Sequence, residues 1–210
     1  MLRIALTKGR LEKSTVALFE KMGLDIDALL NKGRKLILPV GEDITVVLAK
    51  APDVITYVEH GVCDMGVVGK DTIAERGGAF YEVLDLGFGK CKFVVAVPKG
   101  HTFYDGYDIK RLASKYPHVT REYFSRKGMD VDIIKIEGSV ELAPLLALSD
   151  GIVDIVETGT TLRENGLVEL EDVMQLSARL IVNTASMKLK KNEINDFIAQ
   201  VERLVEEAEG

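Results

Sequence analysis

Short apolar runs alternate with amphipathic stretches along the whole chain, a pattern typical of α/β proteins. The pattern predicts strands at 3–7, 35–40, 44–49, 64–68, 81–86, 90–98, 118–121, 131–136, 152–156, 167–176 and 179–183. It predicts helices at 11–22, 25–32, 53–60, 72–76, 109–116, 122–128, 140–148 and 191–209, and a short helix-like run from 162 that stops at 165–166. We therefore expect mixed or parallel sheets with helices on their faces.

The alternation restarts near residue 89, among several glycines, and no Ser- or Pro-rich linker interrupts it. This indicates two α/β lobes: lobe I is residues 1–89 with 178–210, and lobe II is residues 90–177. The amphipathic helix at 191–209 is expected to pack on lobe I or to face a partner. Ligands of such folds bind at the carboxyl ends of strands, so a cleft between the lobes is the expected binding site.

Residues 157–161 form the most suggestive strand-to-helix junction. They are Glu157, Thr158, Gly159, Thr160 and Thr161, and they follow a buried strand that carries Asp154. Threonine hydroxyls and a bare glycine backbone at a helix start can hold a phosphate. The two carboxylates could hold ribose hydroxyls or a magnesium ion.

Three further junctions have related chemistry, at residues 8–10, 69–71 and 138–139. Lys8, Gly9 and Arg10 put cations and backbone donors at a helix start, and Asp71 suits the first turn of the next helix. Each junction taken alone is equally well an ordinary turn between strand and helix. Their coincidence at strand ends favours an anion-binding cleft.

The composition of the chain argues against several classes of function. The chain has 210 residues, 47% of them hydrophobic, and a net charge of −6, which argues against a general nucleic-acid binder. It shows no secretory leader and no apolar run of membrane-spanning length, so we expect a cytoplasmic protein that binds no membrane. Three scattered histidines give no zinc-ligand spacing, and Cys63 and Cys91 read as buried thiols, although spacing leaves a disulfide open.

Nine residues match a family signature in order and spacing, namely Glu141, Ser149, Ile152, Asp154, Ile155, Thr158, Gly159, Thr161 and Leu162. In these, and in residues 7–11, 64–71, 138–141 and 165–167, the chain resembles the short form of the ATP phosphoribosyltransferase family. It departs from the family at two positions. Ala147 stands where the signature usually has Gly, which we interpret as a helix position that tolerates a methyl group. Lys50 stands where many members carry Arg, which would replace a bidentate contact by a point charge.

The resemblance implies a two-lobe fold of the periplasmic-binding-protein type (type II) and a magnesium-dependent pentosyltransferase. N1 of ATP would attack C1 of 5-phosphoribosyl 1-diphosphate and release diphosphate, the first step of histidine biosynthesis. The magnesium would arrive with the substrate, and we assign it no protein ligand. The resemblance also implies a homodimer that lacks the histidine-binding regulatory domain and joins a partner similar to histidyl-tRNA synthetase in a hetero-octamer.

The resemblance also assigns roles to the candidate site residues. Phosphoribosyl diphosphate would be held by Glu141, Asp154, Glu157, Thr158, Gly159, Thr160 and Thr161. ATP and diphosphate would be held by Lys8, Gly9, Arg10, Arg34, Lys50 and Asp71. Of these, Lys8, Arg10, Lys50 and Asp154 are the candidates for the catalytic groups.

Two other classes share parts of this pattern. A solute-binding or effector-sensing module would have the same two lobes without chemistry, but would be expected to follow a signal peptide or a helix-turn-helix segment. A phosphoribosyltransferase of the Rossmann-like kind typically has two adjacent acidic residues before its loop, whereas Asp154 lies between Val153 and Ile155.

Overall fold

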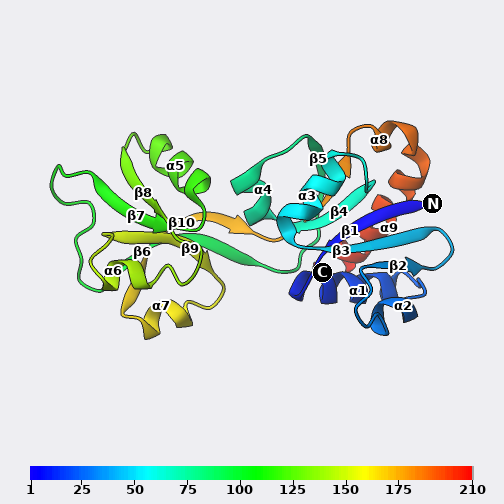
Figure 1. Ribbon diagram of the computed structural model, residues 1–210, viewed down its shortest axis with the longest axis horizontal. Helices are drawn as coiled ribbons and strands as arrows, with labels where there is room; N and C mark the ends of the chain where they lie inside the picture. Colours follow the sequence, from blue (N-terminus) through cyan, green and yellow to red (C-terminus); the bar gives the residue numbers. More distant parts are fainter. Residues whose placement is uncertain (210) are drawn as a thin grey trace. The chain divides into compact units, whose positions relative to one another are not determined.

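The computed structural model describes residues 1–209, which form two compact units (Figure 1). Unit 1 contains residues 1–89 and the segment from Ser177 onward, and unit 2 is Lys90–Leu176. Each unit holds one mixed sheet with helices against it, which confirms the predicted α/β fold of two lobes.

Unit 1 is built on a six-stranded sheet in the order β2-β3-β1-β4-β11-β5. Its strands are β1 (Leu2–Thr7), β2 (Ile37–Val40), β3 (Ile44–Ala49), β4 (Met65–Gly69), β5 (Phe80–Asp85) and β11 (Ala178–Asn183). Its helices are α1 (Arg10–Lys21), α2 (Asp27–Leu30), α3 (Ala51–Glu59), α4 (Lys70–Arg76), α8 (Ser186–Leu189) and α9 (Lys191–Glu209). Strand β1 runs parallel to β3 and β4, and the other pairings are antiparallel.

Helices cover both faces of this sheet (Figure 1). On one face α1 and α9 meet where the rings of Phe19 and Phe197 pack edge to face, 6.2 Å between centroids. On the other face α3 buries Val54 and Val58 against the sheet. The amphipathic helix predicted at 191–209 therefore packs on unit 1, because its apolar stripe belongs to this core.

Unit 2 has a five-stranded sheet in the order β10-β6-β9-β7-β8. Its strands are β6 (Cys91–Pro98), β7 (Lys110–Ser114), β8 (Val131–Lys135), β9 (Gly151–Val156) and β10 (Leu167–Leu176). Its helices are α5 (Pro117–Arg126), α6 (Leu142–Leu145) and α7 (Thr160–Glu164). Strands β7, β8 and β9 are parallel, while β6 is antiparallel to both β9 and β10.

The segment 109–126 folds differently from the sequence prediction. Residues predicted as a helix at 109–116 form strand β7, and the strand predicted at 118–121 lies inside helix α5. Leu112, Ala113 and Ser114 are wholly buried between β8 and β9, so their sheet neighbours override the helical spacing. Pro117 fits the first turn of α5, because that turn needs no N–H donor.

Helix α6 is shorter than the predicted helix at 140–148. Pro144 has no N–H and cannot bond back to Val140, so the helix begins only at Leu142 and has the proline in its first turn. At the other end Ala147 has φ 55°, the one positive φ of a non-glycine residue in the described chain. The interpretation of Ala147 as a helix position is therefore wrong. It is a left-handed residue just past the helix, where glycine is favoured.

Neither Cys63 nor Cys91 is in a disulfide. Cys63 is buried in unit 1, and burial raises its pKa to about 11, while Cys91 is half-buried at the start of β6. The disulfide that spacing left open is not formed. The Cys63 thiol stays protonated at neutral pH, so it is no ready nucleophile.

Candidate active site

In unit 2 the candidate residues gather at one edge of the sheet. Strands β7, β8 and β9 are parallel, so their carboxyl ends at Ser114, Lys135 and Val156 lie at the same edge. The segments that leave these ends carry Lys115, Glu141 and residues 157–161. Sequence-distant groups are thus brought together by strand pairing alone.

Residues 157–161 make a tight turn between β9 and α7. Gly159 has a left-handed backbone with φ 70°. A Cβ built there would lie 2.8 Å from Oε1 of Glu169 and 3.0 Å from Nη1 of Arg163. Glycine is favoured by the left-handed backbone, and a side chain at this position would also require the ends of the Glu169 and Arg163 side chains to move.

The turn is tied together by its own side chains. The guanidinium of Arg163 donates from Nη1 to the carbonyl of Thr158 at 3.0 Å and from Nη2 to Oγ1 of Thr160 at 3.1 Å. The hydroxyls of Thr158 and Thr160 are 3.1 Å apart, and the side chains of Glu157, Thr158, Thr160 and Thr161 are exposed. The helix start adds backbone N–H groups that have no acceptor within a helix. The turn is therefore preformed and presents donors to solvent, the arrangement that suits a phosphate.

Asp154 lies on β9, on the sheet face that Ile152 and Val156 share with α6 and α7. The pKa of its carboxyl is raised to about 6, chiefly by burial and also by the nearby charge of Glu141, against the lowering effects of the backbone N–H of Ile155 and of the charge of Lys115. Glu141 itself is half-buried at the start of α6. The carboxylate of Asp154 is thus held in a poorly solvated place, where a cation or a sugar hydroxyl would stabilise its charged form.

Unit 1 gathers a second group at the carboxyl ends of its own parallel strands. Thr7 and Ala49 are register partners at the ends of β1 and β3, and the N–H of Lys8 donates to the carbonyl of Ala49 at 2.9 Å. Lys50 follows directly as the N-cap of α3. The backbones of Lys8 and Lys50 are therefore neighbours, although 42 positions separate them in the sequence.

Three more candidates belong to this edge. Gly9 is the N-cap of α1 with φ 99°, and Arg10 is the first residue of that helix. Arg34 precedes β2, and the N–H of Leu48 donates to the carbonyl of Leu36 at 2.8 Å, so the chain enters β2 at this same edge. Within residues 1–209 the exposed side chains of Lys8, Arg34 and Lys50 form no ion pair with a carboxylate. They are available to a polyanion.

Asp71 lies in the first turn of α4, as predicted. Its carboxylate folds back over Gly69, so closely that any Cβ at position 69 would overlap Oδ1. Gly69 ends β4, parallel to β1, which puts Asp71 on the same edge as Lys8. The structure thus groups the predicted site residues into one cluster in each unit.

Two cations of unit 2 escaped the sequence prediction. Lys115 follows strand β7, which the sequence pattern predicted as a helix. The sequence therefore did not show that Lys115 stands at the end of a strand. Arg163 was left out because a lone arginine in a short helix looks like a solvated residue. The only signal in the sequence was its spacing of three from Thr160, which lets side chains meet on one helix face.

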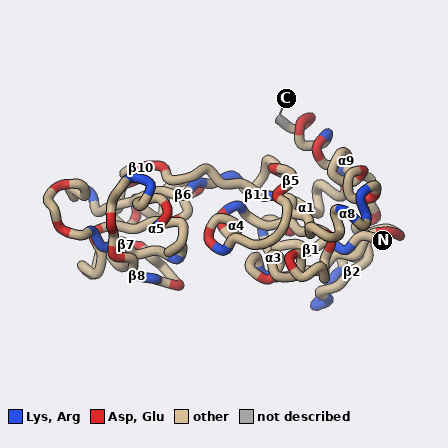
Figure 2. Tube along the Cα trace, turned by 90° about the horizontal axis from the view of Figure 1, so that it is seen from above, with Lys and Arg blue, Asp and Glu red and all other residues tan. Residues whose placement is uncertain are grey.

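Charge is distributed evenly elsewhere. Figure 2 shows Lys and Arg residues interspersed with Asp and Glu residues along the traces of both units. No helix among the described residues is long and apolar enough to cross a membrane.

Two mixed sheets with helices against them, joined by two chain crossings, define a two-lobe α/β protein with the fold of the periplasmic-binding-protein type. The periplasmic aliphatic sulphonate binding protein SsuA of Escherichia coli has this fold, with TM-score 0.60 over 97% of this chain and 72% of that chain, at 14% identity.

The family model of HisG, ATP phosphoribosyltransferase, matches residues 50–203, and the chain belongs to this family. It is 60% identical to the ATP phosphoribosyltransferase of Clostridium kluyveri over 99% of this chain and 95% of that protein. It is likewise 60% identical to that of Clostridium acetobutylicum, over 98% and 96% of the two chains. A solved structure from Thermotoga maritima, the ATP phosphoribosyl transferase (HisG:HisZ) complex, is similar with TM-score 0.83 and 34% identity, covering 99% of this chain and all of that chain.

Proposed function

We propose that this chain is a pentosyltransferase that transfers the 5-phosphoribosyl group of 5-phosphoribosyl 1-diphosphate to N1 of ATP. The C1–O bond to diphosphate breaks, the N1–C1 bond forms, and the products are diphosphate and N1-(5-phosphoribosyl)-ATP. This is the first step of histidine biosynthesis. The observation that carries the proposal is 60% identity to a named ATP phosphoribosyltransferase over nearly the whole chain.

Unit 2 has the groups that phosphoribosyl diphosphate requires. Residues 157–161 would receive the 5-phosphate through threonine hydroxyls and backbone N–H groups, with the guanidinium of Arg163 beside them. Asp154 and Glu141 would accept hydrogen bonds from the ribose hydroxyls. As C1 loses diphosphate it gains positive charge, and a carboxylate held in a poorly solvated place stabilises that charge more strongly than one in water.

Unit 1 has the positively charged side chains that would neutralise the phosphate groups of the substrates. Lys8, Arg10, Arg34 and Lys50 would neutralise the leaving diphosphate and the ATP phosphates, and Asp71 would accept a hydrogen bond from the nucleotide. The nucleophile is a neutral ring nitrogen, so the protein needs no general base. Its tasks are alignment and charge stabilisation.

Magnesium is compatible with this site, because the carboxylates of Asp154 and Glu141 could add oxygen ligands to an ion that the substrate holds. We assign the ion to the substrate, where it supplies further countercharge to the diphosphate when bound. We propose that the reaction takes place in the cytoplasm.

Assembly follows from the same relatives. The Thermotoga maritima structure is named as a HisG:HisZ complex, and the present chain aligns with all of its matched chain. We propose that this chain likewise joins a regulatory partner of the HisZ type, similar to histidyl-tRNA synthetase, in a hetero-octamer, and that alone it is a homodimer.

The deciding experiment measures diphosphate release by the purified chain with ATP, phosphoribosyl diphosphate and magnesium, with and without a HisZ-type partner. Ultraviolet absorbance follows modification of the adenine ring in parallel. Release that requires both substrates supports the proposal. If neither preparation releases diphosphate while phosphoribosyl diphosphate still binds, the chain is a ligand-binding module instead.

A further inference from the structure

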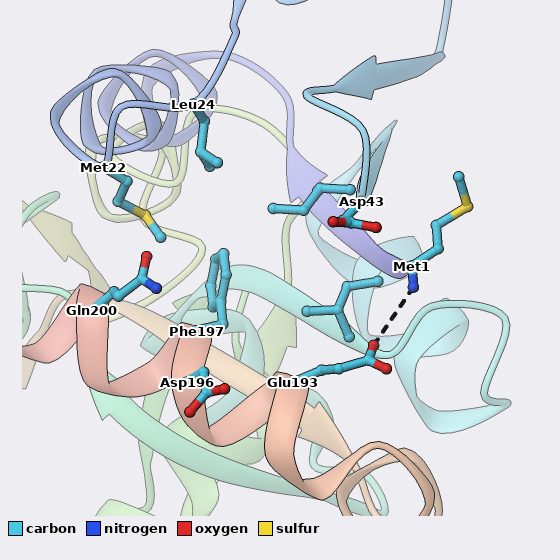
Figure 3. A pocket seen from close by; sticks show the side chains of 10 residues that line it. Met1, Met22, Leu24, Asp43, Glu193, Asp196, Phe197 and Gln200 are labelled. Carbon is cyan, nitrogen blue, oxygen red and sulfur yellow. Dashed lines mark ion pairs between the residues drawn. The ribbon is translucent and has the colours of Figure 1, made fainter.

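A pocket of about 450 Å³ opens in unit 1, away from the candidate active site (Figure 3). It lies at the amino ends of β1 and β3, where Leu2 and Ile44 line it. The candidate cations Lys8 and Lys50 follow the opposite, carboxyl ends of the same strands. The two ends of β1 are roughly 17 Å apart at the rise of an extended strand, so the pocket is a separate place.

The floor of the pocket is apolar. Leu2, Ile44 and Phe197 are buried there, and Met22 and Leu24 are half-buried beside them. In Figure 3 the side chains of Met22, Leu24 and Phe197 are gathered on one side of the opening. A volume of this size is within the range of small-molecule sites, and its lining would contact an aliphatic or aromatic group.

The rim of the pocket is acidic. Asp43 stands on the turn between β2 and β3, and Glu193, Asp196 and Gln200 stand on one face of α9. Glu193 is 3.6 Å from the terminal amine of Met1. In the described chain Asp43 and Asp196 pair with no cation. The rim therefore carries uncompensated negative charge above an apolar floor.

A neighbouring carboxylate shows the contrast. Asp64, also in unit 1, is buried and accepts hydrogen bonds from Ser186 Oγ and Lys190 Nζ, each at 2.8 Å. These partners, against the opposing effect of burial, hold its pKa below the usual range. The carboxylate of Asp64 thus has its hydrogen-bond partners within the protein, whereas the charges of Asp43 and Asp196 face an open pocket.

We propose that this pocket binds a small organic cation that carries an apolar group, such as an arylalkyl ammonium ion. The apolar group lies on Met22, Leu24 and Phe197, and the ammonium lies between Asp43 and Asp196. Nucleotides, sugar phosphates and zwitterionic amino acids are disfavoured, because their anionic groups would meet the acidic rim. The site is thus distinct in chemistry from the anion-binding edges.

The methionines provide a direct test. In protein labelled with 13C at the methionine methyls, Met22 reports on the pocket, while Met129 and Met174 in unit 2 are internal references. The probe is phenethylamine, compared with neutral 2-phenylethanol and anionic 3-phenylpropanoate. We expect only the amine to shift the Met22 signal, with a Kd on the order of 1 mM, as for a weakly held fragment.

Charge variants complete the test. Asp43→Asn with Asp196→Asn should weaken phenethylamine binding by about twofold to fivefold for each carboxylate removed. Gln200→Glu should strengthen it, and Glu202→Gln, which removes a charge from α9 outside the pocket, should leave it unchanged. Equal binding of the alcohol, or an amine affinity that ignores both rim substitutions, overturns the proposal.

A protein side chain could offer the same chemistry. The comparison ligand is therefore a capped phenylalanyl-lysine amide. Binding of the free amine that matches or exceeds that of the peptide supports a small-molecule site. Peptide binding about tenfold tighter, a difference of 1.4 kcal/mol, would show that the pocket receives a polypeptide instead and would overturn the small-molecule assignment.

Discussion

The two sheet edges carry candidate residues in different ways. At the unit 2 edge, Arg163 binds the carbonyl of Thr158 and the hydroxyl of Thr160, and the ends of the Glu169 and Arg163 side chains lie close over Gly159. At the unit 1 edge, Lys8, Arg34 and Lys50 are exposed and unpaired within residues 1–209. One edge has a turn that its own side chains tie together, and the other has a cluster of exposed cations.

This difference teaches where single substitutions should matter. A preformed turn loses its geometry as a whole when one contact is removed, because its groups act together. Long exposed cations contribute separately, each is screened by water and salt, and one can replace another. We therefore expect large effects in unit 2 and small, additive ones in unit 1.

The largest effect is expected for Gly159→Ala. The added methyl would push aside the end of the Arg163 side chain, which ties the turn together through Thr158 and Thr160, and it would strain a left-handed backbone. Displacement of the turn by about 1 Å should lower kcat/KM for phosphoribosyl diphosphate about a hundredfold. Steady-state kinetics measure this loss, and circular dichroism checks that the fold is kept.

Gly166→Ala is the matched control for that variant. Gly166 also has φ 70°, yet a Cβ there would meet nothing within 4 Å. It bears the same backbone strain of roughly 1–2 kcal/mol without the clash. If Gly166→Ala lost as much activity as Gly159→Ala, backbone strain and not the shape of the turn would explain the loss.

Asp154→Asn should lower kcat/KM by roughly tenfold to a hundredfold, the range for a lost hydrogen bond to a charged group. The pKa near 6 predicts that the wild-type kcat/KM falls as pH drops below about 6, and this acid limb should vanish in the variant. Asp132→Asn, an exposed acid on β8, should keep both the rate and the limb.

The same substitution, Asp154→Asn, should lower activity but raise the stability of the fold at alkaline pH. The pKa of Asp154 is raised in the folded protein, so this group favours folding below its unfolded pKa of 3.8 and loses that contribution as pH rises through about 6. At pH 8 the asparagine variant should therefore be more stable than the wild type, by up to about 3 kcal/mol. Urea unfolding at pH 4 and pH 8 tests this, and an unchanged or lower stability at pH 8 would contradict it.

The sequence predicted most of the fold that surrounds these residues. Strand β9 and helix α7 were predicted from a buried apolar run followed by glycine and threonine, and α9 from its apolar stripe. Strand β7 was missed because Ala113 and Ser114 have low strand propensity, and only burial between β8 and β9 makes them extended. That error concealed Lys115. The sequence could not show which tertiary neighbours override local preference.

The site residues likewise include some that the sequence could predict and some that it could not. Residues 157–161 are consecutive, so their chemistry was visible as a motif. The partnership of Arg163 with Thr158 and Thr160 depends on side-chain orientation, which no spacing rule fixes. The pairing of Lys8 with the end of β3 depends on sheet order. Motifs within one loop are predictable from sequence, whereas contacts made by sheet pairing are not.

Lys8→Ala and Lys50→Ala should each lower kcat/KM by only about twofold to fivefold, as exposed charges do. The double variant should lose about the product of the two, and its rate should depend less on ionic strength. Lys50→Arg should match or exceed the wild type, since a guanidinium can bind phosphate bidentately. Lys21→Ala, at the far end of α1, is the control. A single substitution that costs a hundredfold would show that the unit 1 edge is as preorganised as the unit 2 edge.

The smallest effect is expected for a substitution at Ala147. It tests whether backbone strain in unit 2 always contributes to the candidate active site. Ala147 has φ 55° just past α6, and its side chain is exposed. The N–H of Ala147 donates to the carbonyl of Pro144 at 3.1 Å, and the N–H of Leu148 donates to the carbonyl of Ala143 at 2.9 Å. These two bonds are typical of an α-helix that ends in a residue with left-handed backbone conformation.

Because this conformation costs alanine more than glycine, Ala147→Gly should raise the free energy of unfolding by about 1 kcal/mol and leave kcat/KM unchanged. Ala199→Gly, the same exchange inside α9, should lower it by about 1 kcal/mol. Opposite signs for one chemical change would show that backbone conformation decides the outcome. A loss of activity in Ala147→Gly would instead mean that the strained end of α6 positions Glu141, and that the preformed edge of unit 2 extends beyond its phosphate turn.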